Sequence, residues 1–215
     1  MILLVNILTY KILMIPAILI AFTFHEYAHA FVADRLGDKT PKFQGRLTLN
    51  PLAHIDPLGF IMIILAGFGW AKPVQVNPRV FKNYYKDDLK VSIAGPLANV
   101  LVAVVVAAIL SVVNKFLPHY LYFNPVIDLL IGILYITIQL NCTLAFFNMM
   151  PLPGLDGFHV LRDLFPAKTY KIYEKIYPYQ TVILILFIVI PGISGLLVHT
   201  PANALFGFIA KIFNI

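Results

Sequence analysis

Charged residues are scarce in this sequence. They make up 12% of the 215 residues, while 60% are hydrophobic and the mean hydropathy is +0.85. A soluble domain has about 25% charged residues, so this composition excludes one. Several apolar stretches are long enough to cross a bilayer, which takes about 20 residues. We therefore expect a multi-pass helical membrane protein that forms a single domain over residues 1–215.

Cysteine is nearly absent as well, since Cys142 is the only one. A single cysteine excludes an internal disulfide bond and a cysteine-rich metal site. The net charge of +6 does not indicate a nucleic-acid partner, because Lys and Arg collect in those loops of a membrane protein that stay in the cytoplasm. The first apolar stretch has no small-residue cleavage site, so we interpret it as a retained span rather than a signal peptide.

The apolar stretches predict an all-α polytopic membrane protein with about four transmembrane helices. A shorter apolar piece cannot cross the bilayer as a straight helix, and it is typical of a re-entrant or interfacial segment. Alternation of apolar and polar residues in the loop before it predicts a short strand-like edge near the functional site. The predicted spans cover residues 10–35, 89–113, 126–150 and 181–198, the re-entrant segment covers 58–71, and the strand covers 46–49.

Lys and Arg are concentrated in two of the predicted loops. The loop between the first and second spans and the loop between the third and fourth spans hold most of them. The loop between the second and third spans has only Lys115, and the C-terminal tail has only Lys211. Because basic residues favour the cytoplasm, we expect both basic loops inside the cell and both termini outside.

Three ionisable side chains interrupt the first span: His25, Glu26 and His29. A HExxH motif on a helix puts two imidazoles one turn apart on the same face, with a carboxylate beside them. Two such imidazoles can share a zinc ion, and the glutamate can take a proton from water. Going from Lys11 at the outer face, His25 lies about 21 Å along the helix in a hydrocarbon core about 30 Å thick. The expected metal site is therefore in the cytoplasmic third of the membrane.

Asp156 is the candidate for a third ligand, because catalytic zinc takes three protein ligands. It lies in the segment 148–157, where two prolines end the third span at membrane depth and two glycines permit tight turns. A broken backbone in the bilayer is tolerated only where protein or a water-filled cavity surrounds it. Two alternatives stay open on the residues alone: Asp156 caps a helix that begins at Phe158, or His159 is the ligand.

Two further polar residues are candidates with more than one interpretation. His54, in the loop after the first span, is a ligand, a proton carrier or a hydrogen-bonded loop residue. Asn99 lies one turn from Gly95 on the second span, where it either bridges to a neighbouring helix or lines the cavity.

At these residues the chain resembles the site-2 protease family of intramembrane zinc metalloproteases. The resemblance rests on separated motifs in the right order, which cover most of residues 20–165, and it is to the small bacterial and archaeal branch that lacks a PDZ or CBS domain. The motifs are His25-Glu26-x-x-His29, Gly45-Arg46-Leu47-Thr48-Leu49-Asn50-Pro51, His54-Ile55-Asp56-Pro57, Trp70-Ala71-Lys72-Pro73-Val74, Ala94-Gly95-Pro96-Leu97-Ala98-Asn99 and Asn148-x-x-Pro151-x-Pro153-x-Leu155-Asp156-Gly157.

The resemblance implies one zinc ion per chain, bound by His25, His29 and Asp156, with Glu26 as the catalytic base. It implies that Asn148 contacts the substrate backbone or the developing oxyanion, and His54 and Asn99 are weaker candidates for such contacts. The implied catalytic core covers about residues 10–165, and residues 166–215 form an accessory helix and tail.

The implied activity is hydrolysis of peptide bonds in the transmembrane segment of a single-span membrane protein, with a regulatory factor as one candidate substrate. The oligomeric state is left open. A membrane metal-binding or transport protein and a catalytically silent homologue are the alternative functions. Transporters usually show repeats with paired broken helices, and no repeat is visible in this sequence.

Overall fold

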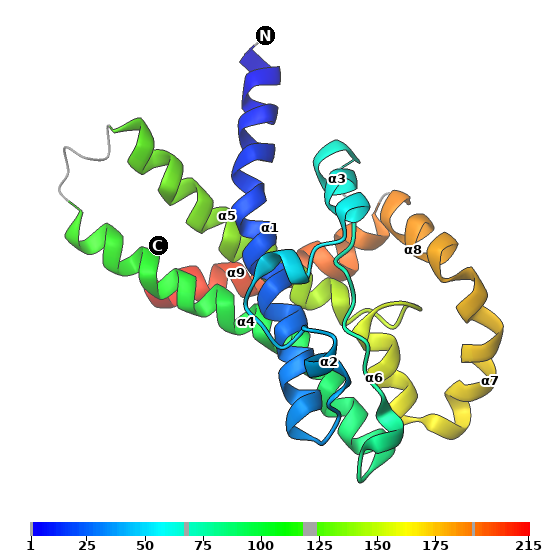
Figure 1. Cartoon of the computed structure of the whole chain (residues 1–215). Helices are drawn as coiled ribbons and strands as arrows, with labels where there is room; N and C mark the ends of the chain where they lie inside the picture. The colour runs from blue at the N-terminus through cyan, green and yellow to red at the C-terminus, as the bar shows by residue number, and fades with distance from the viewer. Residues whose placement is uncertain (1, 67–68, 118–123, 191) are drawn as a thin grey trace.

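The computed structural model describes residues 2–66, 69–117, 124–190 and 192–215, and these residues are largely helical (Figure 1). The long helices are α1 (Ile2–Arg35), α4 (Tyr84–Phe116) and α5 (Pro125–Asn148). The shorter ones are α2 (Thr40–Phe43), α3 (Pro57–Ala66), α6 (Asp156–Leu164), α7 (Pro166–Ile176), α8 (Gln180–Val189) and α9 (Thr200–Phe213). Five helical stretches are long and apolar enough to cross a membrane. The prediction of an all-α polytopic membrane protein is confirmed.

Helices α1, α4, α5 and α9 pack around a shared apolar core. Small and branched side chains of α4 meet α5 on one side and α9 on the other, and Cys142 of α5 is among the buried residues. On α1, four alanines are fully buried and let the neighbouring helices approach closely. The core residues are Val102, Ala103, Val106, Ala107, Leu110, Ile138, Cys142, Ala202 and Ile209.

The first three predicted spans correspond to α1, α4 and α5, but the fourth is wrong. Residues 181–198 do not form one helix, because α8 ends at Val189 and Gly192 has a positive φ of 93°. The chain resumes as a π-helical turn, Gly195–His199, that leads into α9. Hydropathy does not register such a break, and the apolar tail that follows it forms a further packed helix. The membrane-length stretches at this end are Pro166–Val189 and Gly195–Phe213.

The predicted strand over residues 46–49 is also wrong, since no strand occurs among the described residues. Arg46 turns its side chain inward, and Asn50 caps a short 3-10 helix, Pro51–Ala53, so this stretch has no partner strand. The only extended pairing in the described chain is an isolated antiparallel bridge between Ile55 and Ala71.

The predicted re-entrant segment, residues 58–71, contains α3 and the start of the extended chain that follows it, and residues 67–68 lie outside the described part. The Nζ of Lys11 donates a hydrogen bond to the carbonyl of Leu65 at 3.2 Å. The end of α3 therefore lies beside the first turns of the α1 span, and the chain then returns to form the bridge at Ala71.

Helix α6 is fixed to the first turns of α4 by charged groups. Arg162 donates to Asp163 at 2.8 Å and forms an ion pair with Asp88. Both carboxylates are buried, so the arginine neutralises charge where water is scarce. This contact holds the helix that begins with Asp156 against α4.

Candidate active site

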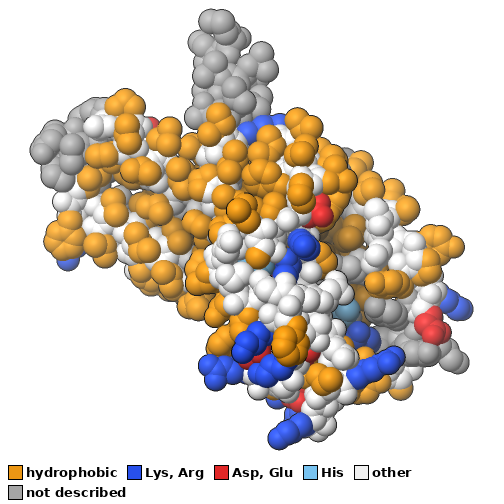
Figure 2. All heavy atoms as spheres, in the orientation of Figure 1, with side chains coloured by type: hydrophobic (Ala, Val, Ile, Leu, Met, Phe, Trp, Pro, Cys, Tyr) orange, Lys and Arg blue, Asp and Glu red, His pale blue; other side chains and the backbone are white. Residues whose placement is uncertain are grey.

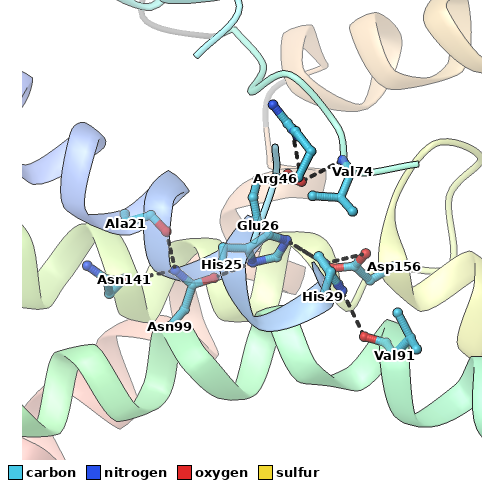
Figure 3. A network of polar contacts seen from close by, with 10 residues as sticks. All are labelled: Ala21, His25, Glu26, His29, Arg46, Val74, Val91, Asn99, Asn141 and Asp156. Atoms are coloured by element: carbon cyan, nitrogen blue, oxygen red, sulfur yellow. Dashed lines mark hydrogen bonds and ion pairs between the residues drawn. The ribbon is translucent and has the colours of Figure 1, made fainter. Parts of the chain in front are cut away.

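The residues of the HExxH motif lie on a buried stretch of α1. His25, Glu26 and His29 are all buried. The two Nε2 atoms are 3.0 Å apart, and the rings meet edge to face with their centroids 4.6 Å apart. Figure 3 shows both imidazoles turned toward Asp156. The four-residue spacing on a helix produces this pairing.

Asp156 reaches the histidines from the first turn of α6. Its Oδ2 is 3.2 Å from Nε2 of His25, and its Oδ1 is 3.3 Å from Nε2 of His29. The candidate ligand atoms of the three residues all lie within 4.8 Å of one another. Gly157 permits this approach, because a Cβ there would lie 2.1 Å from the carbonyl oxygen of Met149. A larger residue would push α6 away from the turn that follows α5.

Hydrogen bonds on the far side of each ring fix the tautomers of both histidines. Nδ1 of His29 lies 2.7 Å from the carbonyl of Val91, which can only accept, so this nitrogen carries the hydrogen. Nδ1 of His25 lies 2.7 Å from Oδ1 of Asn99 and donates to it. In both rings Nε2 is therefore the nitrogen that faces the carboxylate of Asp156 and is left for a metal ion.

The centre of the site consequently holds two imidazole nitrogens that face a carboxylate. Oδ2 of Asp156 is a buried atom with no hydrogen-bond partner among the described residues. Groups of this kind held this close need a proton or a metal ion between them. Two imidazole nitrogens and a carboxylate oxygen are the donor types that catalytic zinc binds, so these residues fit a zinc ion.

Asn99 continues as a hydrogen-bonded chain into α5. Its amide nitrogen donates to the carbonyl of Ala21 at 3.3 Å and to Oδ1 of Asn141 at 2.8 Å. Asn141 in turn donates to the carbonyl of Thr137 at 2.8 Å. Because the amide nitrogen of Asn99 donates to these partners, its Oδ1 is the atom that accepts the hydrogen bond from His25. Asn99 thus lies behind the ligand rather than in the cavity, and it links α1, α4 and α5.

Gly95 presses the backbone of α4 against the two imidazoles. A Cβ at this position would lie 2.3 Å from Nε2 of His29 and 2.7 Å from Nε2 of His25. No side chain fits there while both rings keep their places.

Glu26 points toward the chain between α3 and α4 (Figure 3). Its Oε2 accepts a hydrogen bond from the backbone N–H of Val74 at 2.8 Å and lies 4.0 Å from Nη2 of Arg46. Its other oxygen, Oε1, accepts no hydrogen bond from the described residues. The carboxylate is therefore oriented through one oxygen.

The remaining sequence candidates lie outside this cluster. His54 is fully buried, its Nε2 donates to the carbonyl of Thr48 at 2.7 Å, and burial lowers its pKa. Asn148 is the half-buried last residue of α5 and makes no described contact with the histidines. His159 follows Asp156 by one turn of α6 and is not part of the ligand group; burial lowers its pKa too.

Sequence reasoning missed the roles of Arg46 and of the backbone of Val74 and Val91. Every residue carries a backbone amide and carbonyl, so the last two have no signature. Arg46 has one, because it is the only basic residue between Lys42 and Lys72.

A HExxH pair and a distant aspartate that meet inside a bundle of membrane-length helices define a zinc metallopeptidase of the membrane. The chain belongs to peptidase family M50, whose sequence pattern matches residues 13–129 and 119–190.

Three relatives named "Putative zinc metalloprotease" are similar to this chain. YwhC of Bacillus subtilis is 44% identical over 154 residues, which are 71% of this chain and 69% of that protein. Rip2 of Mycolicibacterium smegmatis is 28% identical over 190 residues, 85% of this chain and 69% of that protein. MJ0611 of Methanocaldococcus jannaschii is 32% identical over 146 residues, 66% of this chain and 64% of that protein. No solved structure matches the chain.

The family and these relatives confirm the function expected from the motifs. The chain is a site-2-protease-like intramembrane zinc metalloprotease, a multi-pass membrane protein that uses zinc and acts on membrane proteins in the bilayer. Neither the transporter nor the silent homologue is favoured.

Proposed function

We propose that His25, His29 and Asp156 bind the catalytic zinc ion and that Glu26 is the general base. The substrate is the locally unfolded transmembrane segment of a single-span membrane protein, because a helix keeps its amides in its own hydrogen bonds. One observation carries the assignment of ligands: two buried imidazoles and a half-buried carboxylate bring their ligand atoms within 4.8 Å of one another, and Oδ2 of Asp156 has no hydrogen-bond partner among the described residues.

Zinc bound at these residues supplies a Lewis acid that polarises a carbonyl group and lowers the pKa of water to about 7. Glu26 accepts a proton from the attacking water and then gives it to the nitrogen of the leaving amine. Val91 and Asn99 accept the Nδ1–H groups of the two imidazoles, which leaves both Nε2 atoms to face the ion. Asp156 would supply one negative charge against the two positive charges of the ion.

Asn148 is the proposed donor to the developing oxyanion. It ends α5 immediately before the turn that leads to Asp156. Loss of one oxyanion donor typically costs on the order of 10²–10³ in rate. His54 and Asn99 are less suited to this role, because their polar hydrogens already bind the carbonyl of Thr48 and the oxygens of Ala21 and Asn141.

We further propose that the site lies in the cytoplasmic third of the membrane. Hydrophobic side chains cover the upper and left parts of the surface in Figure 2, and Lys and Arg gather toward the lower end. Basic residues favour the cytoplasm, so the loops at this end lie inside and the N-terminus lies outside. The chain ends in a further membrane-length stretch, Gly195–Phe213, which was not among the predicted spans. An additional span changes the side of the membrane on which a chain ends, so we propose a side for the N-terminus only.

The test is the substitution Glu26→Gln in the full chain, reconstituted in lipid vesicles with a single-span reporter protein. Zinc content should stay at one ion per chain while cleavage is lost, because the amide cannot take a proton. Asp156→Asn should lower zinc content as well. Asp34→Asn is the matched control, since it removes a carboxylate of the same helix, α1, that pairs with Lys39 instead of facing the site. Cleavage by Glu26→Gln at the wild-type rate would refute the proposal, and zinc flux without cleavage would favour the transporter.

A further inference from the structure

The chain between α3 and α4 passes beside the catalytic carboxylate. Residues 72–77 have no helix or strand assignment, and Asn77 is in the extended region of backbone space. In Figure 3 the amide of Val74 points at Glu26. The N–H of Val74 is thus the described donor that orients this carboxylate at hydrogen-bond distance, 2.8 Å.

Arg46 fastens this segment two residues before Val74. One of its terminal nitrogens donates to the carbonyl of Ala53, and the other donates to the carbonyl of Lys72. The N–H of Lys72 in turn bonds the carbonyl of His54 at 2.9 Å. Lys72 is therefore held at its carbonyl by the Arg46 side chain, which is only 4% exposed, and at its N–H by the backbone of His54.

The same guanidinium lies close to the carboxylate itself. Nη2, which donates to Lys72, is 4.0 Å from Oε2 of Glu26. The oxygen that receives the Val74 amide is thus also the one nearest the positive charge. Oε1 remains the oxygen available for a proton.

We propose that Arg46 is a positioning residue for Glu26, which it acts on through the Lys72–Val74 backbone and through its own charge. The inference rests on the proposed function, because it takes Glu26 to be the base. A guanidinium is a rigid planar fork that can serve two carbonyls at once, whereas an ammonium is a single point charge. Arginine at this position therefore sets the direction of the carboxylate and not only its charge balance.

The far end of the segment has its own anchor. Oδ2 of Asp38 accepts the N–H of Asn77 at 2.7 Å, and its Oδ1 accepts the N–H of Thr40 at 2.9 Å. Loss of Arg46 should consequently release the part around Val74 and leave the attachment near α4 in place. The metal ligands contact neither Arg46 nor this segment among the described hydrogen bonds.

The experiment compares four single variants and one double variant of the full chain in lipid vesicles with the single-span reporter. Arg46→Met removes charge and donors, Arg46→Lys keeps the charge, and Val74→Pro removes the N–H that binds Glu26 without touching Arg46. Gln75→Pro is the matched control, since it adds a proline one residue away where the N–H has no described partner. For each variant we would measure kcat, KM, zinc content and the thermal unfolding midpoint.

We expect kcat to fall by about 10–100-fold in Arg46→Met and in Val74→Pro, since a small misplacement of a reacting group costs up to about 100-fold. Arg46→Lys should lie between Arg46→Met and the wild type. Zinc content should be unchanged and KM should stay within about threefold in all of them. Because both changes act through one contact, the double variant Arg46→Met/Val74→Pro should have the kcat of the weaker single variant.

Wild-type kcat in both Arg46→Met and Val74→Pro would overturn the inference, and so would a double variant whose losses multiply. Loss of zinc or a rise in KM at constant kcat would show that Arg46 acts on the metal or on substrate binding instead. If Arg46→Met does not fold, Arg46→Lys and Val74→Pro decide the question. Full activity of Glu26→Gln would refute the proposed base itself, whereas an inactive Glu26→Gln beside active Arg46 and Val74 variants would refute only this inference.

Discussion

Substitution of Gly95 by alanine should disable the metal site without touching a ligand. The added Cβ would lie 2.3 Å from Nε2 of His29, 2.5 Å from Cε1 of His25 and 2.7 Å from Nε2 of His25. Both imidazoles are fixed on their far sides, His29 by Val91 and His25 by Asn99. Neither ring can turn away without breaking its hydrogen bond.

The size of the displacement follows from these distances. An ordinary contact of a Cβ begins at 3.4 Å, so His29 would have to retreat by about 1 Å. Metal–ligand distances hold to about ±0.2 Å in working sites, and a misplacement of about 1 Å can cost on the order of 100-fold. We therefore expect Gly95→Ala to lower zinc affinity by about 100-fold or more and to lower cleavage of the reporter in parallel.

The assay is competition for zinc between the purified protein and a chelator of known affinity, with cleavage measured on the same sample. Gly132→Ala is the control, because a Cβ there would meet its nearest neighbour, Leu13, at an ordinary 3.7 Å. That variant should match the wild type in both measurements. Wild-type zinc affinity in Gly95→Ala would mean that α4 does not press on the imidazoles in the working protein, and the site geometry would have to be abandoned.

Two further substitutions test the surroundings of the site. Asn99→Leu removes the acceptor for His25 and should weaken zinc binding by about 10–100-fold. Asn99→Asp keeps that acceptor and should lose less zinc affinity. Equal zinc affinities of the two variants in the same chelator competition would contradict the role of Asn99 as the acceptor for His25. Burial raises the pKa of the Asp163 carboxyl to about 6, against the opposing effect of Arg162 and with a smaller contribution from Asp88. The pKa of Asp163 in the folded protein is thus above its ordinary value of 3.8. The stability that this group contributes is therefore fully present below pH 3.8 and is lost as the pH rises through about 6. Asp163→Asn, which cannot ionise, should escape this loss, and its thermal unfolding midpoint should exceed that of the wild type increasingly between pH 5 and pH 7; parallel pH curves would speak against it.

The parts of the site that sequence reasoning anticipated are those set by local geometry. The spacing of His25 and His29 fixes their common face on any helix. Asp156 was found because prolines and glycines interrupt an apolar stretch at membrane depth. Such signals identify which residues are unusual. They do not say how far apart the residues lie, and the distances of 3.2 and 3.3 Å to Asp156 come from the packing of α6 against α4.

The two wrong predictions have a common physical origin, because a local sequence pattern does not contain the tertiary contacts and backbone turns that decide the structure. Residues 46–49 alternate like a strand, but Arg46 faces inward to bind carbonyls and no second strand is present in the described chain. Residues 181–198 are uncharged and mostly apolar, yet the backbone turns at Gly192 and the rest continues toward α9. Hydropathy measures the preference of a segment for lipid and carries no information on where its helix ends.

Because the site lies among membrane-length helices, α4 must provide hydrogen-bond acceptors that water provides in an aqueous site. In an aqueous site, solvent can satisfy the outer nitrogen of a ligating histidine, but the hydrocarbon region offers none, so a neighbouring helix must provide the acceptor. Val91 and Asn99 provide these acceptors for His29 and His25, and Gly95, midway between them on the same face of α4, lets the backbone come close to both rings. The antiparallel order of these contacts means that a one-residue slip of α4 against α1 would separate all three at once. The constraint on the metal site therefore lies as much in a helix without ligands as in the helix that carries them.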